Sequence, residues 1–172
     1  MKKAFSLIEL LVVIAITAVL LAIALPNLLS TRERARDAKR KQEVNEMKNA
    51  LRLYYNDWQH YPVSETSCGT GKINYIKGCG PTHDVCCPCD GTVDFGVGDC
   101  STIYMKRFPS SFGSDPIAMI KYYSAGGDDF CLKVTLENIA DPNIATSQTR
   151  CSSSCTSAGT TCTGSTYCVC AD

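Results

Sequence analysis

The fold of this chain is decided by residues 5–29, FSLIELLVVIAITAVLLAIALPNLL, an almost uniformly apolar stretch. It contains one charge, Glu9, and residues 10–25 contain none. About twenty such residues form a helix of about 30 Å, which matches the hydrocarbon core of a membrane. We therefore expect residues 5–29 to form a membrane-spanning helix, preceded by the positive charges of Lys2 and Lys3.

The small residue and the acid in this region argue against an ordinary secretory signal. Such a signal has its small-residue cleavage site behind the apolar core, whereas Ala4 precedes it. A carboxylate inside a membrane helix costs about 2.5–3.5 kcal/mol on insertion scales. Glu9 therefore either meets a partner or lies in an ordinary anchor with its carboxylate raised to the headgroups.

The segment at residues 2–10, KKAFSLIEL, followed by LVVIAITAVLLAIALP, resembles the N-terminus of type IV pilins and type II secretion pseudopilins. The resemblance implies a leader peptide of residues 1–4, which a prepilin peptidase removes by cutting between Ala4 and Phe5. It further implies N-methylation of Phe5 and pairing of Glu9 with the N-terminus of a neighbouring subunit. The family usually has Gly where this chain has Ala4; Ala is the nearest residue in size, so we expect processing to occur.

The helical pattern continues through residues 30–59, although Pro26 predicts a kink or a local loss of helix just before it. Residues 31–59 contain no Gly or Pro and many strong helix formers. One apolar stripe at spacings of three and four, which predicts a face packed in a core, consists of Val44, Met47, Leu51, Tyr54 and Trp58. The helix should stop near residues 59–62, because the residue before Pro62 avoids the helical region.

The composition of residues 60–172 predicts a small globular head of short strands. Candidate strands with apolar or alternating patterns are residues 72–77, 92–97, 118–124 and 130–136. The last two are joined by a glycine-containing loop, residues 125–129, which predicts a hairpin. Leu132, Val134 and Leu136 alternate with polar neighbours, so we expect that face to pack on the apolar stripe of the helix. The expected fold class is α+β: a long N-terminal helix on a small antiparallel sheet, as the resemblance also implies, with a disulfide-rich C-terminal region.

Twelve cysteines lie in the head, and their density predicts a disulfide scaffold in an oxidising compartment. The disulfide candidates are Cys68, Cys79, Cys86, Cys87, Cys89, Cys100, Cys131, Cys151, Cys155, Cys162, Cys168 and Cys170. The pairing is open, and sequence-close pairs such as Cys151–Cys155 or Cys168–Cys170 are among the alternatives. From residue 151 onward there are few apolar residues, so disulfides must hold this segment or it stays loose.

Five residues of the head, Cys79, His83, Cys86, Cys87 and Cys89, also have the composition of a zinc or redox site. The spacing of residues 86 and 89 suits zinc ligands or a reactive dithiol. There is no second pair at this spacing to complete a zinc site, and the segment does not open a helix after a strand, which would activate a thiol. We therefore favour structural disulfides.

Asp128 and Asp129, with Glu137, Asn138 and Asp141 downstream, could supply oxygen ligands to calcium. Pseudopilins similar to this chain often hold calcium in a loop of this region. The spacing is not that of an EF-hand, and acids are common in turns, so ordinary turn residues are the favoured interpretation. No other cofactor is expected, and no nucleophile, paired-carboxylate or nucleotide-binding motif predicts an enzyme.

The function that the resemblance implies is a structural subunit of a type IV pilus-like filament. The chain would be held in the cytoplasmic membrane, with its head outside the cytoplasm, and polymerise through its N-terminal helix into a filament on the cell surface. Its partners would be other copies of itself, prepilin peptidase, the assembly machinery, minor pilins and, before assembly, the lipid bilayer. The alternatives are a pseudopilin of a type II secretion system and a membrane-anchored, disulfide-stapled binding module that does not polymerise. The balance of 17 basic and 17 acidic residues indicates no particular partner.

Overall fold

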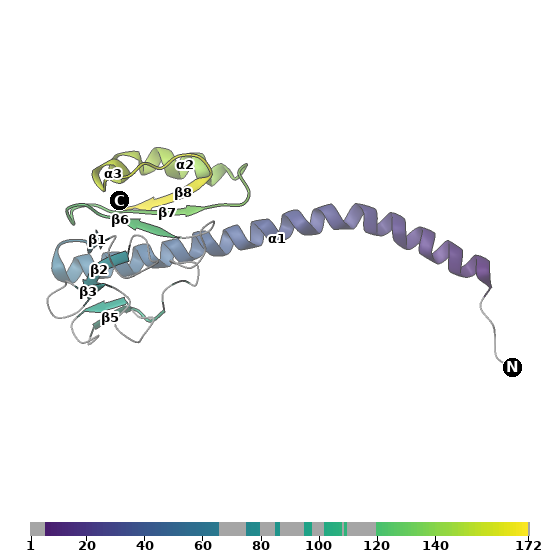
Figure 1. Cartoon of the computed structure of the whole chain (residues 1–172), viewed down its shortest axis with the longest axis horizontal. Coiled ribbons are helices and arrows are strands. Elements are labelled where there is room, and N and C mark those ends of the chain that lie inside the picture. The colour runs from purple at the N-terminus through teal and green to yellow at the C-terminus, as the bar shows by residue number, and fades with distance from the viewer. Residues whose placement is uncertain are drawn as a thin grey trace. The chain divides into compact units, whose positions relative to one another are not determined.

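The structure, a computed structural model, describes residues 6–65, 75–79, 85–86, 95–97, 102–107, 109 and 120–171. Its backbone forms two compact units, Met1–Arg36 and Asp37–Asp172, and each is considered by itself. The elements are α1 (Leu7–Trp58), β1 (Val63–Glu65), β2 (Tyr75–Cys79), β3 (Val85–Cys86), β4 (Phe95–Val97), β5 (Thr102–Met105), β6 (Lys121–Tyr123), β7 (Cys131–Thr135), α2 (Pro142–Arg150), α3 (Ser152–Ser157) and β8 (Thr166–Cys170) (Figure 1).

Helix α1 confirms the long helix that the sequence predicts. It remains helical through Pro26, so the alternative of a local loss of helix there is wrong. Its end also lies where Pro62 predicts. Gln59 adopts a left-handed backbone conformation with φ of 59°, and its N–H donates to the carbonyl of Tyr55 at 2.7 Å. This residue, directly after Trp58, ends the helix.

A three-stranded antiparallel sheet in the order β6-β7-β8 forms the C-terminal half of the head. The predicted hairpin is confirmed, because Tyr122 on β6 pairs with Leu132 on β7 across the loop at residues 125–129. Strand β8 then pairs with the other side of β7, placing Val169 opposite Leu132. Strand β8 was not predicted, because its cysteines obscure the alternation of apolar side chains.

The core of the head lies between one face of α1 and one face of this sheet. Helix α1 contributes Ala50 and four residues of the predicted stripe to this core: Val44, Met47, Leu51 and Tyr54. They pack with the buried sheet residues Tyr122, Leu132, Val134 and Val169. The predicted inward face of β7 is therefore confirmed. Trp58 is the exception to the predicted stripe, since it is 41% exposed at the end of the helix.

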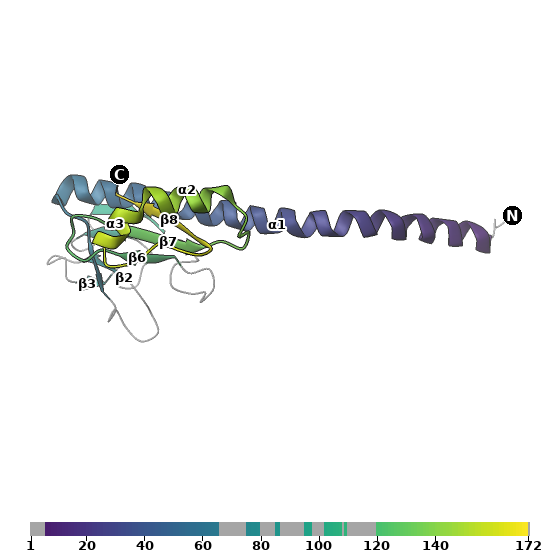
Figure 2. The ribbon, with the colours of Figure 1, turned by 90° about the horizontal axis from the view of Figure 1, so that it is seen from above.

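Helix α2 lies along the edge of β8 that does not pair with β7 (Figures 1 and 2). Ser147 is buried, and its hydroxyl accepts a hydrogen bond from the N–H of Cys168 at 3.1 Å. Gln148 donates through Nε2 to the carbonyl of Thr166 at 3.0 Å. Two outward-facing backbone groups of β8 therefore find partners on a helix. An edge strand covered in this way is not free to pair with another strand.

The hairpin loop between β6 and β7 packs closely on the chain that leaves α1. Gly127 has φ of 82°, a conformation that side chains other than glycine rarely adopt. A Cβ atom on Gly127 would lie 3.1 Å from the carbonyl oxygen of Tyr61. The N–H of Tyr61 donates to the carbonyl of Gly127 at 2.6 Å. Glycine is therefore required here by both conformation and space.

The remaining strands form two small antiparallel sheets, β1-β2-β3 and β4-β5. Strand β2 overlaps the prediction at residues 72–77, and β4 overlaps the prediction at residues 92–97. Strands β1, β3 and β5 were not predicted, because each is only two to four residues long and shows no clear alternation.

The α+β class and the packing of a long helix on a small antiparallel sheet are confirmed. Within the described residues, none of the helices combines the length and the apolar composition that a membrane crossing requires. The expected membrane-spanning first half of the helix is therefore not confirmed.

Candidate assembly site and disulfide-stapled head

The N-terminus of α1 is closed by a contact between Ser6 and Glu9. Glu9 Oε2 accepts a hydrogen bond from the backbone N–H of Ser6 at 3.0 Å, and the carbonyl of Ser6 accepts from the N–H groups of Glu9 and Leu10. The unpaired N–H groups and the positive end of the helix dipole both favour a carboxylate in the first turn. Ser6-x-x-Glu9 also has the spacing of a capping box, a sequence signal that the apolar pattern does not reveal. Ala4 and Phe5, at the predicted cleavage site, lie outside the described residues.

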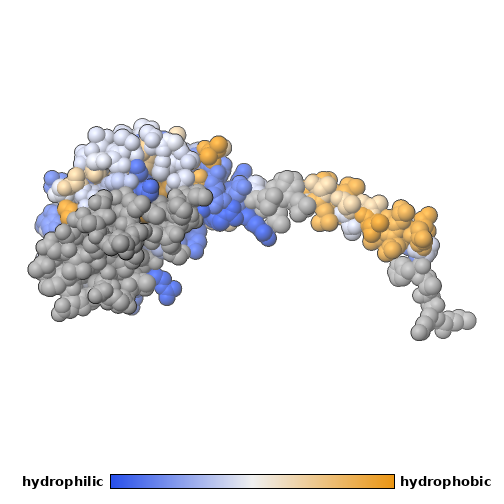
Figure 3. Space-filling view, viewed as in Figure 1, coloured by the Kyte–Doolittle hydropathy of each residue, from blue (hydrophilic) through white to orange (hydrophobic). Residues whose placement is uncertain are grey.

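Apolar side chains cover much of the face of the first part of α1 that Figure 3 shows. The large ones are 48–81% exposed: Leu7, Ile8, Leu10, Leu11, Val12, Val13, Ile14, Ile16, Val19, Leu20, Leu21 and Ile23. The one hydroxyl among them, on Thr17, donates to the carbonyls of Val13 at 3.0 Å and Ile14 at 3.1 Å, so its hydrogen is already used inside the helix. An apolar surface of this extent marks a contact with a membrane or with protein.

At the start of the second unit, Asp37 fastens α1 to the loop between β7 and α2. Its carboxylate is almost fully buried and accepts hydrogen bonds from the backbone N–H groups of Glu137 at 2.9 Å and Asn138 at 2.8 Å. Arg40 donates to the same carboxylate at 3.0 Å and to Glu137 Oε1 at 2.6 Å. The buried charge is therefore compensated by three donors, which is the condition for burying it at acceptable cost.

A second ion pair ties α1 to the start of α2. Lys41 Nζ lies 2.7 Å from Asp141 Oδ2. Asp141 is also the N-cap of α2, since its Oδ1 accepts from the N–H of Asn143 at 2.9 Å. The hydrogen bond from Lys41, assisted by that from Asn143, holds the pKa of the Asp141 carboxyl below its usual value, against the opposing effect of burial.

Among the candidate calcium ligands, Asp129, Glu137 and Asp141 have protein partners. Asp129 Oδ1 accepts from the N–H of Phe130 at 2.8 Å, while Asp128 is exposed in the hairpin loop. Glu137 and Asp141 are engaged by the cations of α1 described above. Within the described part of the chain, no three carboxylates or histidines gather at one place. Calcium binding at Asp128 and Asp129 stays a prediction.

Three disulfides hold the C-terminal region to the sheet. Cys131 on β7 pairs with Cys155 on α3, Cys151 between the helices pairs with Cys170 on β8, and Cys162 pairs with Cys168 on β8. The sequence-close pairs Cys151–Cys155 and Cys168–Cys170 are therefore wrong. Neighbours on the same face of one strand lie almost 7 Å apart with parallel Cβ directions, which a disulfide cannot bridge. No cysteine whose side chain the structure describes is free.

The prediction that disulfides hold residues 151–170 is confirmed, and the segment also forms α3 and β8. In the chain-entropy model, a disulfide that closes a loop of about 15 residues contributes about 3 kcal/mol. The candidate zinc or redox residues do not belong to these three disulfides. Cys79 lies on β2 and Cys86 lies on β3. The other candidates, and two further cysteines, lie outside the described residues: His83, Cys87, Cys89, Cys68 and Cys100.

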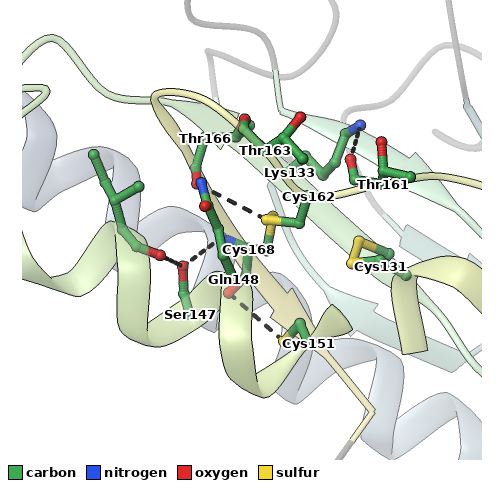
Figure 4. Close-up of a disulfide and its surroundings, with 12 residues drawn as sticks. Cys131, Lys133, Ser147, Gln148, Cys151, Thr161, Cys162, Thr163, Thr166 and Cys168 are labelled. Atoms are coloured by element: carbon green, nitrogen blue, oxygen red, sulfur yellow. Dashed lines mark hydrogen bonds between the residues drawn. A yellow bond between two sulfur atoms is a disulfide. The ribbon is translucent and has the colours of Figure 1, made fainter. Parts of the chain in front are cut away.

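Lys133 occupies the face of the sheet beneath the disulfides. It lies opposite Lys121 on β6 and opposite Cys168 on β8. Its ammonium donates to Thr160 Oγ1 at 2.8 Å. It also donates to the carbonyl of Thr161 at 2.9 Å (Figure 4). It also lies 4.8 Å from the centre of the Tyr123 ring. Burial, and to a lesser degree the charge of Lys121, lower the pKa of Lys133.

A polar and aromatic cluster at the end of α1 explains the exposure of Trp58. Trp58 Nε1 donates to the hydroxyl of Tyr104 at 2.9 Å, and that hydroxyl donates to Asp57 Oδ2 at 2.8 Å. Burial and the bond to Asp57 raise the pKa of Tyr104. Tyr54 packs edge-on against Tyr104 and stacks on Phe95. Burial raises the pKa of Tyr54 to about 12. The indole is thus held at the surface by its N–H rather than buried in the core.

Comparison with known proteins finds a family model that matches the start of the chain and relatives that align with part of it. Residues 1–25 match the family model "Prokaryotic N-terminal methylation motif". The chain is 36% identical over 63 residues to type II secretion system core protein G of Escherichia coli K12, which covers 37% of this chain and 43% of that protein. It is 40% identical over 65 residues to the type IV wide pilus major component PilA4 of Thermus thermophilus, covering 38% of this chain and 50% of that protein.

A third relative is the fimbrial protein of Neisseria meningitidis serogroup B, 36% identical over 78 residues, with 45% of this chain and 46% of the relative covered. The chain thus spans about half the length of the curated relatives that it matches. No solved structure matches it significantly. The resemblance of the N-terminal segment to type IV pilins and type II secretion proteins is therefore confirmed, and residues 1–25 carry the prokaryotic N-terminal methylation motif.

Proposed function

We propose that this chain is a structural subunit of a type IV pilus-like filament and polymerises through the N-terminal part of α1. The observation that carries the proposal is the coincidence of the methylation motif at residues 1–25 with the exposed apolar surface of α1. A helix that is apolar on every side is suited to the interior of a bundle or of a membrane. The same surface would serve both states, in the membrane before assembly and in the filament core afterwards.

Before assembly, residues 5–29 would anchor the chain in the cytoplasmic membrane, and residues 60–172 would form the head outside the cytoplasm. The disulfides of the head support this orientation, because they form and persist in oxidising compartments. Prepilin peptidase would remove residues 1–4, and the assembly machinery would move the subunit from the bilayer into a homo-oligomeric filament at the cell surface, with minor pilins as further partners.

Glu9 would carry the assembly step. Among the described residues, the Ser6 N–H donates to its carboxylate, whose two oxygens together can accept more than one hydrogen bond. In a filament it would meet the methylated amino group of Phe5 on a neighbouring copy. At 4 Å, opposite charges attract by about 4 kcal/mol at an effective dielectric constant near 20. This attraction is comparable to the cost of holding the carboxylate in a membrane, so assembly would relieve that cost.

The second candidate is a pseudopilin of a type II secretion system. The similarity to type II secretion system core protein G of Escherichia coli favours it, because it extends over 63 residues, close to the 65 residues matched with PilA4. A third possibility, an anchored binding module that does not polymerise, would have no use for cleavage before Phe5. None of the three roles is enzymatic, and the names of the relatives suggest the same.

Intact-mass analysis tests the proposal. The full chain is expressed with and without a prepilin peptidase, and the mature form should begin with methylated Phe5. Sheared surface filaments should contain this chain as their main component when examined by electron microscopy. A chain that keeps Met1 in the presence of the peptidase would exclude the filament and pseudopilin roles together. Processed chain without surface filaments would favour the pseudopilin.

A further inference from the structure

Two of the three disulfides that the described residues form lie close to each other (Figure 4). The sulfur atoms of Cys131, Cys155 and Cys168 all lie within 4.8 Å of one another. Cys131 and Cys155 are bonded to each other, whereas Cys168 is bonded to Cys162. The cluster therefore contains no thiolate to hold a metal ion. It does contain a sulfur of one disulfide placed beside both sulfurs of another.

The six cysteines differ in their access to solvent. Cys131, Cys155, Cys168, Cys151 and Cys170 are buried, and Cys162 is the partly exposed member. Thiol–disulfide exchange requires an incoming thiolate to reach one sulfur of the pair, and the other sulfur then leaves. A thiol from solvent therefore reaches Cys162 first, and the sulfur that it displaces is Cys168, the one beside the second disulfide.

We propose that Cys162 is an acceptor site for small external thiols and that Cys168 relays the exchange into the Cys131–Cys155 disulfide. In the first step the external thiolate forms a bond to Cys162 Sγ, the Cys162–Cys168 bond breaks, and Cys168 leaves as a thiolate. In the second step Cys168 attacks the Cys131–Cys155 disulfide and forms a bond to one of its sulfurs. The other sulfur leaves as a thiolate and takes a proton from water. One external thiol is consumed, and no other oxidant or reductant is needed.

The surroundings favour the thiolate that the first step creates. Lys133 lies directly opposite Cys168 in the register of β7 and β8, so the two side chains share one face of the sheet. The hydrogen bond to the carbonyl of Thr161, the residue before Cys162, holds its ammonium on that side. A cation beside a cysteine stabilises the thiolate relative to the thiol.

The relay changes which elements are joined without opening the head. If Cys168 pairs with Cys155, α3 is attached to β8 instead of β7; if it pairs with Cys131, β7 and β8 are joined directly. In both products Cys151–Cys170 stays closed, because neither of its sulfurs belongs to the cluster of three. The head can therefore carry a thiol adduct at Cys162 while its C-terminal segment remains cross-linked.

The first test uses the unmodified full chain with reduced glutathione at limiting concentration. Samples are quenched with acid, labelled with N-ethylmaleimide and mapped by non-reducing peptide mass spectrometry. We expect glutathione on Cys162, a new disulfide from Cys168 to Cys131 or Cys155, and the label on the cysteine that was released. The label on Cys168 alone would overturn the relay. Glutathione first on Cys151 or Cys170, or on none of the six, would overturn the acceptor site.

Two variants test the relay without an external thiol. Cys162→Ser leaves Cys168 without its partner beside the cluster, and Cys151→Ser leaves Cys170 without its partner outside it. We expect the label in Cys162→Ser to appear on Cys131 or Cys155 at pH 8, where thiolates are available for exchange. In Cys151→Ser the label should stay on Cys170. An unchanged Cys131–Cys155 disulfide in Cys162→Ser at pH 8 would contradict the relay, and the glutathione test does not depend on either variant folding.

Discussion

Asp37 and Asn138 are 101 positions apart in the sequence, yet the buried carboxylate of Asp37 accepts a hydrogen bond of 2.8 Å from the backbone N–H of Asn138. Asp37 is also the first residue of the second compact unit. Residues 30–36, immediately before it on α1, are all exposed. The attachment of α1 to the head therefore begins at a single buried charge.

Replacing Asp37 by Asn should destabilise the head. The amide removes the charge that compensates Arg40 and presents one acceptor oxygen where the carboxylate offers two. Breaking a buried ion pair on one side costs about 3 kcal/mol or more. The change in the free energy of unfolding is measured by urea unfolding of the full chain in mild detergent, with circular dichroism as the signal. Glu33→Gln, an exposed acid on the same helix, is the control and should stay within about 0.5 kcal/mol of the parent.

Gly127→Ala should be distinctly more harmful than Gly126→Ala. At Gly127 the added methyl group meets the Tyr61 carbonyl at 3.1 Å in a left-handed conformation, whereas at Gly126 the nearest atom is 4.0 Å away on a side chain. The left-handed conformation alone costs about 1–2 kcal/mol for a residue with Cβ. Thermal unfolding of the two variants gives the comparison. Equal melting temperatures would show that the loop does not need its approach to Tyr61.

The ion pair of Lys41 with Asp141 predicts part of the acid sensitivity of the head. The pKa of Asp141 is lower in the folded chain than in the unfolded chain, so the unfolded chain binds more protons as the solution becomes acidic. The stabilisation is complete above the unfolded pKa, about 3.9, and is lost as the pH falls through the lower folded value. Asp141→Asn keeps an N-cap for α2 but does not titrate.

The measurement is the free energy of unfolding between pH 6 and pH 2 for the parent and for Asp141→Asn. The parent should be the more stable of the two at pH 6, and the difference should shrink as the pH falls. In a Lys41→Met background, Asp141→Asn should change the free energy of unfolding at pH 6 by less, because Lys41 is the principal cause of the lowered pKa of Asp141. A difference that is constant over this range would mean that the ion pair does not contribute.

Glu9→Gln separates the two roles of Glu9. Glutamine can still accept the hydrogen bond from the N–H of Ser6, since capping boxes accept Glu or Gln, but it carries no charge. If pairing with a neighbouring N-terminus drives assembly, filament yield relative to the membrane pool should fall for both Glu9→Gln and Glu9→Leu. Thr17→Val is the control in the same helix and should assemble normally, because the Thr17 hydroxyl donates only within its own helix. Normal filaments with Glu9→Gln would reduce Glu9 to a helix cap.

Local patterns in the sequence predict α1, its end before Pro62 and the β6–β7 hairpin. Each depends on residues close together in the chain: helix formers without Gly or Pro, a proline after the last turn, and alternation around a glycine loop. The buried face of β7 follows from the same alternation. The capping contact of Ser6 with Glu9 could also have been predicted, because a serine followed three residues later by a glutamate is a known sequence signal for a helix start.

The rest depends on contacts that no local pattern reveals. No sequence pattern distinguishes Asp37 from the other acids of α1, such as Glu33 and Glu43. Only the packing of α1 on the head buries it. The disulfide partners are set by which cysteines the sheet and α3 bring together, and composition leaves every pairing open. Trp58 fits the apolar stripe, but the hydroxyl of Tyr104, 46 positions away, holds it at the surface.

The cover that α2 provides to β8 bears on how copies of this protein can associate. Bare strand edges let sheets grow from molecule to molecule through backbone hydrogen bonds, and such growth is very hard to reverse. On the β8 side of this head, Ser147 and Gln148 occupy two of the backbone groups that such growth would use. If copies of this chain assemble as proposed, their heads would have to contact one another there through side chains, whose contacts can be made and released as subunits join and leave.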